Sequence, residues 1–220
     1  MLNEAANIQA AIASARQYSS IEVIAVDAGS TDESVRLARE TGAIVINSQR
    51  GRANQMNAGA WQAHSDILIF LHADSRLPPN YRDVVLQTAQ KPGFVAGAFR
   101  LGIDAKGLPL RVIEWGANVR SKLFASPYGD QALFMKAESF YLVGGFPQLP
   151  ILEDVAIIQN LAGQGRVLLT HATVTTSARS WLDRGALAVT LLHQFILLGY
   201  ACGLPLSVLT KLKSATRRPK

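Results

Sequence analysis

Two residues able to do chemistry, His72 and Asp74, follow a continuous apolar run at residues 67–71. The run is too short for a typical helix and is bounded by polar residues and by Pro78 and Pro79, so it predicts a strand covered on both faces. Open α/β sheets bind ligands at the carboxyl ends of such strands, where residues two apart point the same way. A carboxylate and an imidazole there could hold a divalent cation against a phosphate. The alternative is that Asp74 only caps the turn before the helix at the prolines.

Strand and helix patterns alternate around this run. Strands are predicted at residues 21–26, 43–46, 67–71, 94–101, 129–135 and 167–176, with helices in the intervals between them. Ser30 and Glu33 are spaced as a capping box for the helix that ends near Glu40. This alternation with short connections is typical of a parallel sheet, so we predict an α/β fold.

Composition narrows the class of protein. The 220 residues suffice for one well-cored domain plus an appendage, and 49% hydrophobic with 17% charged residues exclude a disordered chain. The single cysteine, Cys202, permits no internal disulfide, so a reducing compartment fits best. The first five residues, beginning at Met1, lack the basic region and apolar core of a signal peptide. We therefore expect a cytoplasmic location.

The formal charge of +6 is unevenly distributed. The tail at residues 211–220 carries five positive charges and no acid, which leaves the remainder close to neutral. This pattern argues against a broad nucleic-acid-binding face, so no nucleic acid partner is expected.

An uncharged stretch precedes that tail, at residues 185–210. Its 26 positions would give about 39 Å of helix, long enough to span a bilayer. Gly199, Gly203 and Pro205 interrupt it, which favours the alternative of a buried or surface-docked helical hairpin. We divide the chain into a domain at 1–184 and, at 185–220, an apolar helical hairpin or membrane-associated segment with a basic tail. The tail favours peripheral binding at the cytoplasmic face of the inner membrane.

An ordered set of motifs runs through the chain. It comprises Asn3-Glu4-Ala5, the run from Val26 to Asp32, Gly51 to Gly59, His72-Ala73-Asp74, Gly129-Asp130-Gln131, Gly144-Gly145-Phe146 and Glu153-Asp154. From Leu2 to about Trp181 this set resembles the family 2 glycosyltransferases, in a small bacterial branch. The resemblance implies the GT-A fold, a Rossmann-like, mostly parallel twisted sheet flanked by helices. It also implies a nucleotide-diphosphate sugar as the donor.

The resemblance assigns three residues to the donor nucleoside. Asp27 would accept a hydrogen bond from the base, usually uracil, and Asn3 and Glu4 would border the same pocket. A carboxylate suits this task because it only accepts, and so rejects a base that presents no donor. Alternatively, Asp27 is a turn carboxylate that helps to cap the next helix.

In the same comparison, His72-Ala73-Asp74 occupies the place of the family's Asp-x-Asp signature, with histidine replacing the first acid. Asp74 matches the residue that ligates Mn²⁺ or Mg²⁺, and the metal would neutralise the leaving diphosphate. His72 would hydrogen-bond ribose or a phosphate, or else be a structural histidine.

Two arginines match basic positions of the family. Arg52 would lie near the base or diphosphate, or be an exposed helix-start residue, and Arg179 would pair with the diphosphate bidentately. Asp130 would contact the transferred sugar or the acceptor, or be a turn residue. Trp181 is interpreted as a core indole and Asn57 as a structural amide.

The acidic pair Glu153 and Asp154 matches the acceptor side of the family. In an inverting displacement one carboxylate removes the proton of the acceptor hydroxyl as the anomeric carbon is attacked. We assign that role to Asp154, with Glu153 in support. The alternative is that both are ordinary acids in the first turn of a helix, where the dipole favours them.

One family element is missing. Members begin with an apolar strand just before the equivalent of Leu2-Asn3-Glu4, whereas this sequence starts at Met1. The slot for that strand would lie inside the sheet and leave its neighbours with unpaired backbone groups. We predict an exposed groove between the strands near Ile24 and Ile69, and direct pairing of those strands would refute it.

Other function classes are weaker. A nucleotidyltransferase shares a similar sheet and metal but would need a glycine-rich basic loop after a first strand. A catalytically degenerate nucleotide-binding protein at a membrane surface is a further alternative, suggested by His72 and the missing strand. The sequence has no G-x-G-x-x-G and no P-loop motif, which excludes dinucleotide and P-loop enzymes. The apolar segment at 185–210 suggests a lipid-linked acceptor.

Overall fold

A computed structural model describes residues 1–215, apart from the side chains of Arg184 and Ala215; residues 216–220, half of the predicted basic tail, lie outside it. Its strands are β1 (Ile24–Asp27), β2 (Ile44–Asn47), β3 (Ile67–Phe70), β4 (Ser75–Arg76), β5 (Phe94–Asp104), β6 (Leu133–Lys136) and β7 (Arg166–Ser177). Its helices are α1 (Ile8–Ala15), α2 (Ser34–Glu40), α3 (Arg52–Gln62), α4 (Tyr81–Ala89), α5 (Leu108–Phe124), α6 (Ala137–Leu142), α7 (Glu153–Ala162), α8 (Arg179–Arg184), α9 (Ala186–Ala201) and α10 (Leu206–Ala215), with a 3-10 turn at Gly129–Gln131.

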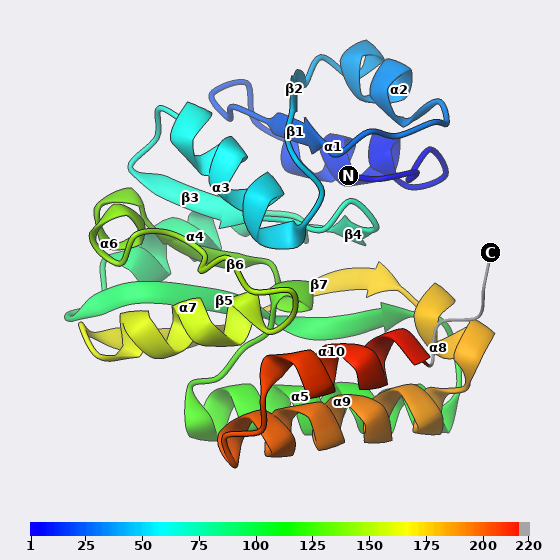
Figure 1. The fold of residues 1–220 in the computed structure, drawn as a ribbon. Helices are drawn as coiled ribbons and strands as arrows, with labels where there is room; N and C mark the ends of the chain where they lie inside the picture. Colours follow the sequence, from blue (N-terminus) through cyan, green and yellow to red (C-terminus); the bar gives the residue numbers. More distant parts are fainter. Residues whose placement is uncertain (216–220) are drawn as a thin grey trace.

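The strands form two separate sheets. β1 and β2 pair in parallel, and a larger sheet has the order β3-β6-β5-β7-β4. In the larger sheet β5 and β7 are parallel, whereas β3–β6, β5–β6 and β4–β7 are antiparallel. The predicted α/β fold class is thus confirmed, with a mixed sheet flanked by helices (Figure 1). Among the described strands, parallel pairing is limited to the β1–β2 and β5–β7 pairs.

The main core surrounds β5 and β6, the most deeply buried strands. Ala96, Phe134 and Met135 have no exposed surface. One cluster joins these strands to α3, α6 and α7, and a second joins them to α4. Because helices cover both faces, these strands are apolar almost throughout. The strand at 67–71, predicted to be covered on both faces, is instead β3 at an edge of the larger sheet, where only Leu68 is buried.

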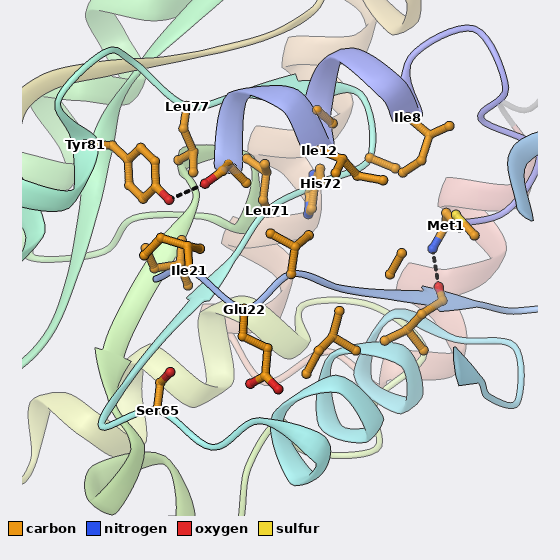
Figure 2. Close-up of a pocket in the computed structure, with 18 of the residues that line it drawn as sticks. Met1, Ile8, Ile12, Ile21, Glu22, Ser65, Leu71, His72, Leu77 and Tyr81 are labelled. Carbon is orange, nitrogen blue, oxygen red and sulfur yellow. Dashed lines mark hydrogen bonds between the residues drawn. The ribbon is translucent and has the colours of Figure 1, made fainter. Parts of the chain in front are cut away.

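A groove separates the two sheets. β1 pairs with β2 and β3 pairs with β6, but β1 and β3 are not paired with each other. A cavity of about 230 Å³ lies between them, lined by both strands and by α1 (Figure 2). The predicted groove between the strands at Ile24 and Ile69 is confirmed.

The apolar carboxyl-terminal segment forms a hairpin of α9 and α10. α9 packs beside α5 (Figure 1). Leu209 of α10 is fully buried against Ile151 and Ile196. Among the described residues, no helix has the length and apolar character needed to cross a membrane. Of the two predicted alternatives, the structure shows the hairpin docked on the domain.

Two local predictions were wrong. Residues 129–131 form a 3-10 turn before β6 instead of the start of a strand. The capping box also fails, because Ser30 donates its hydroxyl to Asp27 and α2 begins later, at Ser34. There the Asp32 carboxylate accepts the Ser34 amide at 3.0 Å. Competing local hydrogen bonds of short polar side chains explain this second difference.

Candidate active site

The loop after β1 holds Asp27 by three hydrogen bonds. The amides of Gly29 and Ser30 donate to Asp27 Oδ2 at 2.9 and 3.0 Å, and the Ser30 hydroxyl donates to Oδ1 at 2.5 Å. Burial raises the pKa of this carboxyl, but the bonds from Ser30 and Gly29 outweigh it, so the pKa lies below its ordinary value. Asp27 is therefore an ionised turn carboxylate. A contact with a nucleotide base would use the lone pairs that these bonds leave open.

Asn3 and Glu4 are fastened to the same loop. The Thr31 amide donates to Asn3 Oδ1 at 2.8 Å, and the Glu4 amide donates to the Ser34 hydroxyl at 2.7 Å. Asn3 has a φ of 55°, a left-handed conformation that asparagine tolerates better than most residues. The structure thus brings Asn3, Glu4 and Asp27 together, as the sequence predicted.

Arg179, at the start of α8, bridges this loop to the turn after β3. Its guanidinium lies 2.6 Å from Glu4 Oε1 and 3.9 Å from Asp74 Oδ2. Burial, with a contribution from the Glu4 charge, raises the pKa of Asp74 above its ordinary value. The three residues come from distant parts of the chain and form a compact charged group that a diphosphate or a cation could enter.

His72 has different neighbours from Asp74. A Cβ on Gly129 would lie 3.0 Å from His72 Nε2 and 3.2 Å from Asp154 Oδ2, so both side chains flank this glycine. The chain turns at Asp74, where the Ser75 amide bonds back to the His72 carbonyl at 3.0 Å, so the two side chains contact different groups. Burial, helped by the Arg52 charge, lowers the pKa of His72 to about 3, so its imidazole is neutral at physiological pH.

The acidic pair lies at the start of α7. Asp154 accepts the Gly129 amide at 2.7 Å through Oδ2 and the Val155 amide at 2.9 Å through Oδ1. Glu153 is 3% exposed, and its Oε1 lies 3.7 Å from Arg52 Nη1. Burial and the Asp154 charge raise the pKa of Glu153. The arginine is half-exposed at the start of α3, so both interpretations of Arg52, a helix-start residue and a site residue, agree with its position.

Asp130 lies on the 3-10 turn beside this pair. Burial, followed by the Asp154 charge, raises its pKa to about 6. The sequence reasoning missed two neighbours: the Arg120 guanidinium lies 3.3 Å from the ring centroid of Tyr128, and its charge acts on Asp130. Nothing in the sequence marked them, because Arg120 occupies an ordinary position of an amphipathic helix.

The two halves of the site form one neighbourhood. The Arg52 charge affects the pKa of His72, Asp74, Asp130 and Glu153, which places these groups within electrostatic range of one side chain. Asp27 is linked to them through Ser30, whose hydroxyl donates to Asp27 and accepts the Asn3 amide. The adjacent Glu4 then pairs with Arg179, which lies near Asp74. The acids do not converge on one point: in the described part of the chain no three His, Cys, Asp or Glu side chains are placed to hold a metal ion together.

Two of the motif residues have structural roles. Asn57 donates to the Phe146 carbonyl and accepts the Phe146 amide, both at 2.8 Å, which ties α3 to the turn after α6. Trp181 is 9% exposed and packs with Leu101 and Leu110. The interpretations as a structural amide and a core indole are confirmed.

Comparison with known proteins places this site in context. Residues 1–142 match the model described as glycosyl transferase family 2. No curated protein sequence matches the chain.

Solved structures with the same fold are glycosyltransferases. The mannosyltransferase PcManGT from Pyrobaculum calidifontis, in complex with GDP-Man and Mn2+, aligns with a TM-score of 0.64 and 20% identity, over 80% of this chain and 54% of its own. S. aureus TarS 1-349 aligns with a TM-score of 0.62 and 15% identity, over 81% of this chain and 58% of its own. Glucosyl-3-phosphoglycerate synthase from Mycobacterium tuberculosis aligns with a TM-score of 0.63 and 17% identity, over 93% of this chain and 78% of its own. This chain therefore spans little more than half the length of the first two.

Proposed function

Because this chain belongs to glycosyl transferase family 2 and shares the GT-A fold of these enzymes, we propose that it transfers a sugar, with inversion, from a nucleotide-diphosphate sugar to an acceptor hydroxyl. The observation that carries this proposal is the acidic pair near Gly129, next to the carboxyl end of β3, where the partly buried Asp154 accepts the Gly129 amide and the neighbouring Glu153 is buried. Asp154 takes the hydroxyl proton, the acceptor oxygen bonds to the anomeric carbon, and the bond to the diphosphate breaks. The nucleoside diphosphate leaves with that electron pair.

The donor occupies the side of Asp27 in this proposal. Asp27, Asn3 and Glu4 contact the nucleoside, and Arg179 pairs with the diphosphate when the donor displaces Glu4. The neutral His72 donates a hydrogen bond to ribose or phosphate. Related structures hold Mn2+ with GDP-Man and Mn2+ with UDP, which supports a nucleoside diphosphate donor and a divalent metal.

Asp74 is the metal ligand that we propose. One half-buried carboxylate suits Mg²⁺ or Mn²⁺, which often bind through one or two carboxylates while substrate phosphates and water complete the coordination. Such a cation supplies charge that stabilises the leaving diphosphate. The fit agrees with the absence of a three-ligand cluster among the described residues, because the phosphates would provide the remaining ligands.

Substitution of Asp154 tests the assignment of the base. In Asp154→Asn we expect kcat to fall by about 10²–10⁴-fold, the usual contribution of a general base, while the affinity for UDP with Mn²⁺ measured by calorimetry stays within about twofold. Release of nucleoside diphosphate from a panel of nucleotide sugars measures turnover. Asp83→Asn, on the exposed surface of α4, is the matched control.

Two outcomes would contradict this mechanism. Full activity of Asp154→Asn would remove Asp154 as the base and direct attention to Asp130. Tight binding of UDP by the unaltered protein, with no turnover of any donor, would favour the catalytically degenerate binding protein.

We also propose that a membrane-borne acceptor is reached through one face of the molecule. α5 and α9 lie side by side at the end of the fold opposite β1 and β2 (Figure 1). Both expose stripes of large apolar side chains: Leu108, Val112, Trp115, Leu123 and Phe124 from α5, and Leu187, Leu191, Phe195 and Leu198 from α9. Two stripes on neighbouring helices form a patch larger than isolated surface residues explain.

Charge favours an anionic bilayer as the occupant of this face. Residues 185–215 contain no acid, and Lys211 and Lys213 lie on α10. Lys122 adds positive charge in the last turn of α5, where Arg111 is paired with Glu114 and contributes no net charge. An apolar face bordered by basic residues is the pattern of a protein bound in the plane of a membrane surface, peripheral to the cytoplasmic leaflet.

Vesicle co-sedimentation tests this face. The vesicles contain phosphatidylglycerol in phosphatidylcholine. We expect the double variant Trp115→Ser with Phe195→Ser to bind them about tenfold or more weakly, because it lacks two aromatic side chains that would enter the bilayer. Leu86→Ser, on the exposed side of α4, is the control. Equal binding of both variants would contradict the proposal, as would a stable dimer that masks the face.

A further inference from the structure

Arg120 of α5 contacts the loop at residues 125–132, which connects α5 to β6. Its guanidinium lies 3.3 Å from the ring centroid of Tyr128, and its Nε donates to the Ser126 carbonyl at 3.2 Å. Its Nη2 lies 3.5 Å from the side-chain oxygen of Gln131. One planar guanidinium therefore holds the loop near its beginning, its middle and its end, which the single charged nitrogen of a lysine could not do.

Gln131 holds the same loop from the core. Its side chain is fully buried, and its oxygen accepts the Ser121 hydroxyl at 2.7 Å and the Tyr128 amide at 3.2 Å. Its side-chain nitrogen donates to the Phe99 carbonyl of β5 at 3.1 Å. A buried polar group that loses its partner costs about 1–3 kcal/mol, so this arrangement resists displacement of the loop.

The backbone at both ends of the loop is strained. Ala125 and Ala132 have φ angles of 48° and 47°, a left-handed conformation that residues other than glycine rarely adopt. Such a conformation costs about 1–3 kcal/mol for each residue and persists only where the surrounding contacts enforce it. The contacts of Arg120 and Gln131 supply that enforcement. Strain of this kind concentrates at functional sites, and this loop carries Gly129.

Gly129 connects the loop to the proposed base. Its amide donates to Asp154 Oδ2 at 2.7 Å, and the Val155 amide donates to Oδ1 at 2.9 Å. Among the hydrogen bonds of the described residues, the Gly129 amide is the donor that Asp154 receives from outside α7. The position of the loop therefore fixes the direction of this carboxylate, because rotation of the side chain would break the bond to Gly129.

Charge links Arg120 to the same acids. Burial lowers the pKa of its guanidinium, whereas Tyr128 and the charges of Asp130 and Asp154 raise it. The arginine remains protonated, and its charge lowers the pKa of Asp130 against the effect of burial. A cation beside the loop thus offsets part of the repulsion between Asp130 and Asp154.

We propose that Arg120 is a positioning residue for the proposed sugar transfer. By holding the loop at residues 125–132, it keeps the Gly129 amide against Asp154 and orients the base toward the acceptor hydroxyl. This inference rests on the proposed function of Asp154. Because Arg120 acts through Gly129, it affects the rate of the chemical step and leaves the affinity for the donor, which binds at the loop after β1, unchanged.

Arg120→Met in the full chain tests this role. With the donor turned over fastest in the nucleotide-sugar panel, we expect kcat to fall about 10–100-fold, as for other misplacements of a catalytic group. The KM for the donor and the calorimetric affinity for UDP with Mn²⁺ should stay within about twofold. Arg82→Met is the matched control, because the Arg82 guanidinium also lies over a tyrosine ring, 5.6 Å from the centroid of Tyr18. It should change none of these quantities.

A double-variant cycle separates positioning from a general loss of structure. If Arg120 acts through Asp154, adding Arg120→Met to Asp154→Asn should lower kcat by less than about twofold, because the base is already absent. An equal loss in both backgrounds would overturn the proposal, and so would a large rise in KM with kcat unchanged. If Arg120→Met does not fold, Arg120→Lys replaces it, since lysine keeps the charge but cannot make the same contacts.

Hydrogen exchange tests the contact independently of sugar transfer. The Gly129 amide should exchange about tenfold or more faster in Arg120→Met than in the unaltered protein, with little change in α4. Unchanged exchange at Gly129 would overturn the proposal even if kcat falls. If the unaltered protein turns over no donor, the proposed function fails, and the exchange measurement still decides whether Arg120 holds this amide against Asp154.

Discussion

Two groups of acids in this protein have opposite electrostatics. On the loop after β1, hydrogen bonds lower the pKa of Asp27 against its burial, and the Ser34 hydroxyl lowers that of Asp32. Around α7, burial and mutual repulsion raise the pKa of Asp130 and Glu153. Folding therefore stabilises the ionised form in the first group and destabilises it in the second.

This difference agrees with the proposed division into a donor-binding loop and a reactive site. Carboxylates that accept several N–H and O–H donors order their own loop, as Asp27 does. Around α7 the acids are buried or partly buried, and the raised pKa of Asp130 and Glu153 means that their ionised forms cost stability. Such arrangements concentrate where proton transfer occurs. The comparison supports the proposal that the first group binds the nucleoside and the second carries out the chemistry. The following substitutions test that division.

The largest effect on stability is expected from Asp27→Ala. It leaves two amides and one hydroxyl in a buried turn without their acceptor, so urea unfolding should show a loss of about 3–4 kcal/mol. Asp27→Asn keeps an acceptor oxygen and should lose less than half as much. UDP affinity should fall at least tenfold in both variants. Unchanged unfolding of Asp27→Ala would show that the turn does not depend on this charge.

A smaller effect on stability, one that depends on pH, is expected at Asp130. Its pKa is raised to about 6, so the folded protein holds this proton more tightly than the unfolded chain. The resulting stability is present below about pH 4 and is lost as the pH rises through 6, by about 2 kcal/mol between pH 4 and 7. Asp130→Asn should lack this loss when the two unfolding curves are compared across that range. Parallel pH profiles would contradict the assignment.

The smallest stability effect is expected from Arg179→Lys. The arginine is half-exposed, so its ion pair with Glu4 should contribute less than about 1 kcal/mol. The KM for the donor should nevertheless rise about tenfold, because lysine cannot pair bidentately with a diphosphate. Arg82→Lys on α4, also partly exposed, is the control and should change neither quantity. An unchanged KM would remove Arg179 from donor binding.

Much of the fold was predictable because periodicity is local. The strands predicted at 67–71 and 94–101 appear as β3 and β5 within a few residues, and the helix predicted in the interval after the second appears as α5. Local patterns failed where polar side chains had a choice of partners, as at Ser30. Local sequence patterns also do not indicate which strands pair with each other. The division into a parallel β1–β2 pair and a mixed five-stranded sheet was therefore not predictable from them.

The sequence by itself determined the class of fold and the apolar strand at 67–71, because both depend on composition or spacing along the chain. For residues 185–210 it left a spanning helix and a docked hairpin open, and it marked the acids only through an ordered set of motifs. Only the tertiary structure decided which of these acids are neighbours, that Arg179 joins Glu4 to Asp74, and that His72 and Asp154 meet at Gly129. Burial and the charges of residues distant in sequence set their pKa values, and neither exists until the chain has folded.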